Sequence, residues 1–384
     1  MPRLITYSRS EILKRTQCRV GEEKFGERIK LYEYSDNCIQ QLEKQDTTFV
    51  ILGIPEDIGV RANLGRPGTA TAWDNFLDNF LNIQNNRFCK GEWITLLGEL
   101  DFSEEMVRAA QLNPKIKEQR KEMFGLVEQI DEEVVYYVSQ IISWGKIPII
   151  VGGGHNNAYG NIKGFSQAKG TSVNVINFDA HTDLRPMKGR HSGNGFSYSM
   201  KEGFLESYFI FGLHENYISK GVLNEIRKIA GRVKYNTYEE ICVRGEKSFE
   251  DELKIAQKHI ENKHFGLEID LDSIPMIASS AITPSGFSAE ETRRFLHHFA
   301  SLENVGYLHL CEGAPVLGSD KNPNLIGKFI SYLITDFIKA ISKGEIQVIY
   351  NKPLLSSKED VEDYINNLKA LYIKEIENGN QILL

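Results

Sequence analysis

Two stretches decide the fold: residues 147–155 read IPIIVGGGH, and residues 172–183 read SVNVINFDAHTD. Each begins with a nearly continuous run of apolar, mostly β-branched residues, which is typical of a strand buried on both faces of a parallel sheet. Before the first stretch, Ile116–Trp144 carries apolar residues three or four positions apart and is predicted to be a long amphipathic helix. A helix that leads directly into a buried strand indicates an α/β fold.

The same alternation continues along the chain. Further apolar runs predict strands at Thr48–Ile54, Tyr208–Leu213, Phe265–Leu271, Val305–Cys311 and Ile346–Tyr350. Helical spacing is found at Phe249–His259, after Ser288, where Glu291 completes a capping box, and at Asn324–Ile341. The alternation predicts a mostly parallel sheet with helices on both faces.

Composition excludes several classes of protein. The 384 residues include 45 Lys and Arg against 52 Asp and Glu, which gives a net charge of −7. An acidic balance gives no basic surface for nucleic acid. No stretch approaches the roughly 20 apolar residues that cross a membrane. The 20 Phe and 16 Tyr exclude a disordered chain. We therefore expect a globular protein with no nucleic-acid or membrane partner.

The cysteines and the first residues predict a cytoplasmic location. The number of cysteines is odd, none forms a CxxC pair, and they are scattered over Cys18, Cys38, Cys89, Cys242 and Cys311. This pattern is typical of reduced thiols. The opening residues MPRLITYSRSEILKR lack the apolar core of a secretory signal.

Three polar segments each follow a predicted strand: Gly152–His155, Asp179–Asp183 and Asp270–Asp272. Ligand sites in parallel sheets form where strands reach their carboxyl ends. Alternate residues of an extended chain point the same way, so the acids and His181 within the second segment share one side. We expect four carboxylates and two imidazoles to meet at one point.

A group with four carboxylates requires bound cations. Crowded carboxylates repel one another unless positive charge is present, and two divalent ions supply +4 against −4. Oxygen ligands with two imidazoles and no thiolate suit Mn²⁺. Two such ions lower the pKa of a shared water toward neutrality, which predicts hydrolysis. A lone histidine or a single DxD at a strand end is usually structural, but three such segments in one chain are hard to explain by chance.

The motifs GGGH at 152–155, DAHTD at 179–183 and DLD at 270–272 resemble, in order and spacing, those of the ureohydrolase family, which includes arginases, agmatinases and formimidoylglutamases. The resemblance covers residues 47–345. It implies a three-layer αβα fold with a mostly parallel central sheet, two Mn²⁺ ions per subunit, and a homo-oligomer that is a trimer or a hexamer. On this basis the chain divides into an N-terminal extension (1–46), a catalytic domain (47–345) and a C-terminal strand and helix (346–384) packed on the same domain.

Carried over by motif, one ion would be held by His155, Asp179, Asp183 and Asp270, and the other by Asp179, His181, Asp270 and Asp272. Asp179 and Asp270 would bridge the two ions. Three positions depart from the family pattern: Gly154 replaces the usual aspartate, Asn156 replaces the usual serine, and Pro275 stands where arginases carry another aspartate. These departures weaken an arginase or agmatinase assignment more than a metallohydrolase one.

Residues 53–68, GIPEDIGVRANLGRPG, are most similar to formimidoylglutamases, as are DLRP at 183–186 and SGNGF at 192–196. This similarity implies cleavage of N-formimidoyl-L-glutamate to L-glutamate and formamide, a step of histidine degradation. The alternatives are an arginase, an agmatinase or another guanidino-acid ureohydrolase. A non-catalytic family member that serves as a binding subunit is a further alternative.

Several residues are candidates for work on the substrate. An arginine fork binds carboxylate well, and the predicted substrate-binding residues are Arg185, Ser192, Asn194, Arg61 and Arg66. Glu312 matches the family glutamate that faces the cationic carbon of the substrate. Asp183 or His191 would move the proton, since an unperturbed imidazole titrates near pH 6.5. His214 is a weaker candidate for the same task.

Overall fold

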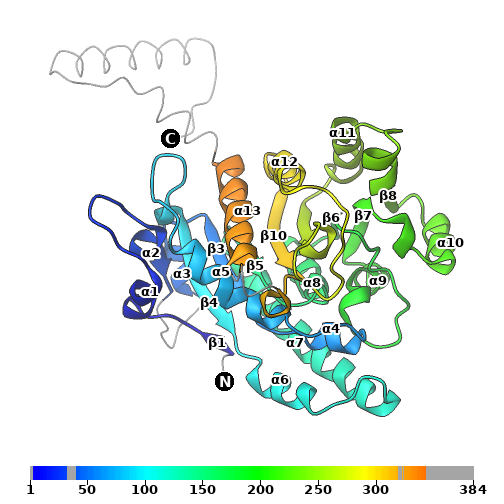
Figure 1. Cartoon of the computed structure of the whole chain (residues 1–384), viewed down its shortest axis with the longest axis horizontal. Coiled ribbons are helices and arrows are strands. Elements are labelled where there is room, and N and C mark those ends of the chain that lie inside the picture. The colour runs from blue at the N-terminus through cyan, green and yellow to red at the C-terminus, as the bar shows by residue number, and fades with distance from the viewer. Residues whose placement is uncertain (1–2, 33–39, 319–321, 323, 343–384) are drawn as a thin grey trace, which may run out of the picture. The chain divides into compact units, whose positions relative to one another are not determined.

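A mixed but mainly parallel sheet forms the centre of the molecule (Figure 1). The computed structural model describes residues 3–32, 40–318, 322 and 324–342. Within these residues the sheet has ten strands in the order β1-β4-β3-β5-β10-β9-β6-β7-β8, with β2 paired to β4. The strands are β1 (Leu4–Ile5), β2 (Lys30–Leu31), β3 (Phe49–Gly53), β4 (Ile94–Leu100), β5 (Ile147–Val151), β6 (Val173–Phe178), β7 (Leu205–Leu213), β8 (Val233–Thr237), β9 (Phe265–Asp270) and β10 (Val305–Cys311).

Helices cover both faces of this sheet, and each face has its own apolar core. One core joins the sheet to α5 (Ala72–Phe80), α11 (Phe249–Ile260), α12 (Ala289–Ala300) and α13 (Leu325–Ile341). The other joins it to α4 (Ile58–Ala62), α6 (Ser103–Ala110), α7 (Lys117–Ser143), α8 (Asn157–Lys169), α9 (Gly195–Lys201) and α10 (Lys220–Lys228). The predicted three-layer αβα fold is confirmed.

The predicted central strands and the long helix before β5 are present within a few residues of their expected bounds. The sequence prediction missed β4 and β8. Gly98, with φ +130°, interrupts the apolar run of β4, and β8 is a short, polar strand at the edge of the sheet. The short helix α4 was not predicted either. The strand predicted at 346–350 and the helix at 355–384 lie outside the described residues.

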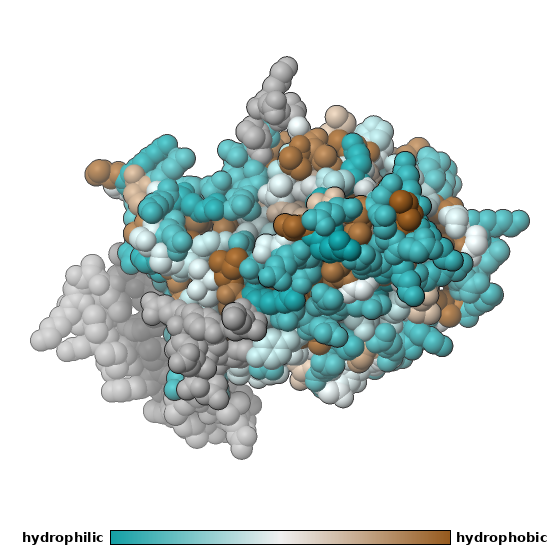
Figure 2. All heavy atoms as spheres, turned by 90° about the horizontal axis from the view of Figure 1, so that it is seen from below, coloured by the Kyte–Doolittle hydropathy of each residue, from teal (hydrophilic) through white to brown (hydrophobic). Residues whose placement is uncertain are grey.

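The segment before residue 47 adds to one edge of the sheet. β1 pairs with β4 in the antiparallel sense and β2 pairs with β4 in the parallel sense. Three short helices accompany them: α1 (Arg9–Arg15), α2 (Phe25–Arg28) and α3 (Gln40–Lys44). Figure 2 shows one face of the molecule, where hydrophilic residues predominate and apolar ones are scattered. No described helix has the length and hydropathy that a membrane span requires.

The order of the inner strands determines where a site can form. β5, β10, β9 and β6 lie side by side and are paired in parallel, so their carboxyl ends reach the same edge. The three polar segments and Glu312 follow these four strands. The topology therefore brings together residues as far apart in the chain as His155 and Glu312.

A buried ion pair fastens α7 to the loop after β6. The guanidinium of Arg190 donates to both carboxylate oxygens of Asp131 at 2.7 and 3.1 Å, to Asn194 Oδ1 at 2.7 Å and to the carbonyl of Asn156 at 2.9 Å. Arg190 is 2% exposed and Asp131 is 4% exposed. Because this arginine also reaches the residue after His155, it connects three segments around the expected site.

We expect D131N to lower the free energy of unfolding by about 3–5 kcal/mol, because it leaves the buried charge of Arg190 without its partner. Urea denaturation measures the change. A matched control is E225Q, which removes the exposed pair of Glu225 with Lys228 and should cost less than about 1 kcal/mol. Equal losses in the two variants would contradict the role given to this pair.

Candidate metal centre

Seven polar side chains meet where β5, β6, β9 and β10 end. They are His155, Asp179, His181, Asp183, Asp270, Asp272 and Glu312. All but His155 and Asp179 line a cavity of about 370 Å³. His155 and Asp179 lie just behind its wall, 1% and 0% exposed. The six residues predicted as metal ligands are therefore brought together.

The six form two groups that share Asp179. In the first, His155 Nδ1 lies 2.9 Å from Asp183 Oδ2, 3.1 Å from Asp270 Oδ2 and 3.4 Å from Asp179 Oδ2. In the second, His181 Nδ1 lies 3.4 Å from Asp272 Oδ1 and 3.5 Å from Asp179 Oδ1. Asp270 was expected to bridge both groups, but it belongs only to the first, and its Oδ1 accepts the Asp272 backbone N–H at 2.8 Å.

Burial and the neighbouring charges shift the pKa values of the aspartates in this group. Burial, together with the charge of Asp272, raises the pKa of Asp270 well above its usual range. Burial and the charge of Asp179 raise the pKa of Asp183 as well. Burial also acts on Asp179, but hydrogen bonds with His155 and His181 outweigh it and lower its pKa. The protein alone thus does not neutralise this cluster of acids.

The donor set fits a pair of divalent cations. Asp272 Oδ1 is buried and has no hydrogen-bond donor among the described residues, although it points toward His181. A buried carboxylate oxygen without a partner is costly, and a cation would satisfy it. Carboxylate oxygens and imidazole nitrogens without a thiolate suit Mn²⁺ among the common metals.

The backbone is strained at two of the seven positions. Asp183 has φ +49° and Glu312 has φ +61°, both in the left-handed region that residues with a side chain seldom adopt. Glu312 Oε1 accepts the backbone N–H of His155 at 2.8 Å, so it ties β10 to the loop after β5. Burial, with the charge of Asp272, raises the pKa of Glu312 to about 8.

A glutamate outside the motifs holds the GGGH loop. Glu56 is completely buried, and its Oε1 accepts from Gly154 N at 3.0 Å, Asn157 Nδ2 at 2.8 Å and Asn156 Nδ2 at 3.1 Å. A Cβ at Gly154 would lie 2.6 Å from Asn156 Oδ1 and 3.3 Å from Glu312 Oε1. A side chain at 154 would therefore collide with Asn156, which Glu56 also holds.

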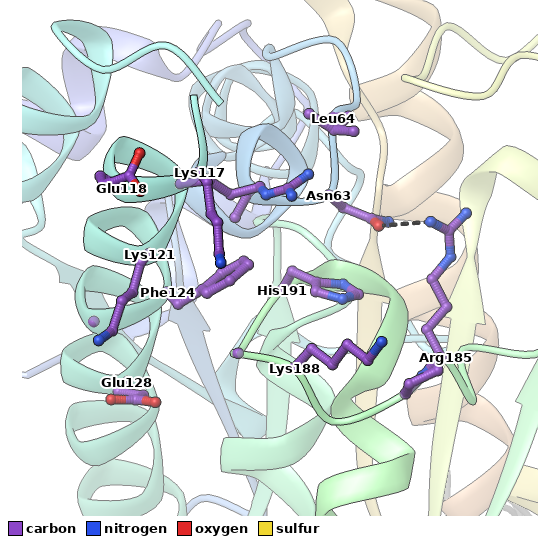
Figure 3. Close-up of a pocket in the computed structure, with 15 residues that line it drawn as sticks. Asn63, Leu64, Lys117, Glu118, Lys121, Phe124, Glu128, Arg185, Lys188 and His191 are labelled. Carbon is purple, nitrogen blue, oxygen red and sulfur yellow. Dashed lines mark hydrogen bonds between the residues drawn. The ribbon is translucent and has the colours of Figure 1, made fainter. Parts of the chain in front are cut away.

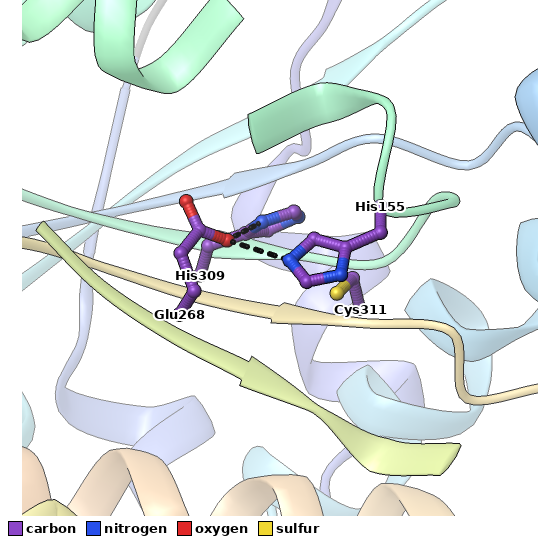
Figure 4. A group of neighbouring side chains, drawn as sticks. All are labelled: His155, Glu268, His309 and Cys311. Carbon is purple, nitrogen blue, oxygen red and sulfur yellow. Dashed lines mark hydrogen bonds and ion pairs between the residues drawn. The ribbon is translucent and has the colours of Figure 1, made fainter. Parts of the chain in front are cut away.

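A second buried group, which includes Glu268 and His309, lies on the Nε2 side of His155 (Figure 4). His155 Nε2 faces Glu268 Oε2 at 3.5 Å. Glu268 accepts from Tyr307 OH at 2.7 Å and contacts His309 Nδ1 at 2.5 Å. The charge of His309 overcomes the burial of Glu268 and lowers the pKa of its carboxyl to about 2. Sequence analysis missed this group, although residues 268 and 270 alternate on one face of β9.

Two of the five predicted substrate-binding residues line the cavity. Arg185 and Ser192 are both there, and Asn63 joins them, donating to Ser192 Oγ at 3.0 Å and accepting from Arg185 Nη1 at 3.1 Å. Arg185 is exposed and forms no ion pair with a described residue.

The other three predicted residues do not line this cavity, and each has partners within the described part of the protein. Arg61 pairs with Asp57 four residues earlier on α4. The guanidinium of Arg66 donates to the carbonyls of Ser279 and Ser280. Asn194 is buried and bonded to Arg190 and to the carbonyl of Gly189.

His191 and His214, which were predicted to move a proton, occupy different positions relative to the metal cavity. His191 does not line the cavity of the six acids and imidazoles. Burial, with Arg185 nearby, lowers its pKa to about 4. His214 stacks on Tyr217 at 5.4 Å, and Tyr217 stacks on His181 at 5.0 Å. Tyr217 also lines the cavity and was not predicted.

Comparison with known proteins agrees with this fold. A formimidoylglutamase of Streptococcus pyogenes serotype M5 (strain Manfredo) is 27% identical over 221 residues, 54% of this chain and 66% of that protein, so the match spans slightly less than two thirds of the relative. The formimidoylglutamase structure of Bacillus subtilis is similar in fold, with a TM-score of 0.65 at 17% identity over 85% of this chain and 94% of that chain. So is Trypanosoma cruzi formiminoglutamase with Mn²⁺, with a TM-score of 0.63 at 20% identity over 83% and 99%. The arginase family model matches residues 47–335, which is most of the chain, and this protein therefore belongs to the arginase family.

Proposed function

We propose that this protein is a manganese-dependent hydrolase that cleaves N-formimidoyl-L-glutamate to L-glutamate and formamide. The observation that carries the proposal is the convergence of four carboxylates and two imidazoles around an unsatisfied oxygen of Asp272. Relatives named formimidoylglutamase and a neighbouring structure that contains Mn²⁺ support it. The resemblance also implies a place in histidine degradation and a homo-oligomer of three or six chains, and the cysteine pattern favours a cytoplasmic location.

One ion would be held by His155, Asp179, Asp183 and Asp270, and the other by Asp179, His181 and Asp272. Asp270 remains a predicted second bridge. When bound, two such ions lower the pKa of water and polarise the group under attack. The chain itself supplies the oxygen and nitrogen donors, and it excludes bulk water from the buried members of the set.

Two acidic residues are placed to act on the substrate. Glu312 faces the cavity and would pair with the cationic formimidoyl carbon through a charge-assisted contact. Asp183 is only half-buried at the cavity wall. It would accept a proton from water and pass it to the leaving nitrogen, which is the task that the sequence also offered to His191.

The alternative enzymes, an arginase, an agmatinase or another guanidino-acid ureohydrolase, differ in the chemical groups that their substrates have beyond the C–N bond that is cleaved. His191 was the feature that favoured an arginase or an agmatinase, and it lies outside the cavity. A non-catalytic family member is favoured by no observation in the site, because the full set of six donors is present and four of them are buried.

We expect the purified protein with Mn²⁺ to release formamide and glutamate from N-formimidoyl-L-glutamate, and to turn over arginine and agmatine far more slowly. Chelation should abolish the activity and added Mn²⁺ should restore it. D272N should lose it, whereas D251N, which makes the same change on exposed Asp251 of α11, should keep it. Preferred turnover of arginine or agmatine would contradict the substrate, and protein purified without bound metal and inert toward the whole panel would favour the non-catalytic member.

The Glu268 group generates a second prediction. An imidazole that binds metal through one nitrogen usually donates its other N–H to a carboxylate, and loss of that partner costs about 10–100-fold in metal affinity. E268Q should therefore weaken Mn²⁺ binding by about that factor, measured by calorimetry on the metal-free protein.

The matched control is E252Q. Glu252 is also buried and hydrogen-bonded, to Asn236 Nδ2 at 3.0 Å, but it lies on α11 away from the site. It should bind Mn²⁺ as the wild type does. A merely structural role for Glu268 would lower the melting temperature of E268Q and leave the affinity for Mn²⁺ unchanged.

A further inference from the structure

A second, larger cavity adjoins the metal cavity (Figure 3). Its volume is about 960 Å³, and its walls are the first turns of α7, the end of α4 and the loop after β6. It shares four lining residues with the metal cavity: Asn63, Leu64, Arg185 and Pro186. A ligand anchored at the metal centre can therefore extend into it past Arg185.

The walls of this cavity are rich in cations. The positively charged lining residues are Lys117, Arg120, Lys121, Arg185 and Lys188, against Glu118 and Glu128. Among the described residues, none of the five forms an ion pair with a carboxylate within 4.0 Å, unlike neighbouring Arg108 and Arg190. Five unpaired cations against two acids leave an excess of positive charge.

The helix strengthens this charge. Lys117 stands three and four positions before Arg120 and Lys121, and Phe124 follows these two at the same spacing, so the four lie on one side of α7. The helix begins at Lys117, and its N-cap residue Ile116 makes no side-chain capping bond. The backbone N–H groups of the first turn and the positive end of the helix dipole add to the attraction for an anion.

A half-buried histidine, His191, stands in the opposite wall. His191 Nδ1 accepts the backbone N–H of Gly193 at 3.1 Å, so the proton of its neutral ring sits on Nε2 as a donor. Burial, then the charges of Arg185, Arg190 and Arg120, keep this ring neutral by lowering its pKa to about 4. The side chain lies beside Phe124, with ring centroids 6.1 Å apart.

The two joined cavities carry opposite charge. Asp183, Asp270, Asp272 and Glu312 line the first, and the cations of α7 and the loop after β6 line the second. We propose that the basic cavity receives the carboxylate-bearing end of the substrate, so that the enzyme selects amidine compounds with an acidic tail over those with a cationic tail. This inference rests on the proposed function and extends it to residues of α7.

The test removes charge from the α7 wall. Lys117 and Lys121 are exposed, so K117Q/K121Q should fold normally. Its KM for N-formimidoyl-L-glutamate should rise about three- to tenfold, the range that a few exposed charge contacts provide. The kcat and the bound metal should stay unchanged. The Kd for L-glutamate, measured by calorimetry on the metal-loaded protein, should rise by the same factor and depend less on salt.

Two further variants sharpen the result. K188Q removes one charge from the opposite wall and should weaken glutamate binding in the same direction. K169Q/K258Q removes two charges from exposed positions on α8 and α11, away from both cavities, and should change nothing.

Unchanged glutamate binding and unchanged KM in K117Q/K121Q would overturn the inference even if the wild type hydrolyses N-formimidoyl-L-glutamate. Equal effects in K169Q/K258Q would overturn it as well, because they would show a general effect of net charge. An inert wild type whose glutamate binding is weakened by K117Q/K121Q would support the anion site and contradict the proposed function instead.

Discussion

The mutual repulsion of buried carboxylates is the constraint on which the site depends. Asp179, Asp270 and Asp272 are nearly inaccessible to water, and Asp183 is within hydrogen-bonding reach of the same His155 nitrogen as Asp270. Burial and neighbouring negative charge push protons onto such groups. Two divalent cations would relieve the repulsion and supply the reactivity of the proposed hydrolase, so one electrostatic requirement would account for both the architecture and the chemistry of this edge of the sheet.

Three buried charged residues outside the GGGH, DAHTD and DLD motifs hold these loops together. Glu56, in the segment after β3, accepts a hydrogen bond from the GGGH loop, and Glu268 faces Nε2 of His155. Arg190 joins α7 to the carbonyl beside His155. Each is buried and each satisfies several polar groups at once, which is how a fold keeps strained backbone such as that of Asp183 in place.

The sequence predicts the fold and the convergence of the six side chains because both follow from local rules. Buried strands are continuous apolar runs, and alternate residues share a face. Glu268 obeys the same alternation, but it sits inside an apolar strand, where a lone acid gives no sign of its partners. Glu56 acts on residues about a hundred positions away, a relation that composition and spacing do not contain. Arg61 was predicted to bind the substrate, but Asp57 stands one helical turn before it and forms an ion pair with it. The spacing i, i+4 in the sequence does indicate this pairing.

The central claim is that two cations occupy the two groups that share Asp179. Anomalous scattering at the manganese absorption edge, from crystals grown with Mn²⁺, tests it most directly. The account predicts two peaks, one beside His155 and Asp183 and the other beside His181 and Asp272. A single peak among His155, Glu268, His309 and Cys311, or no peak between the four strand ends, would contradict it.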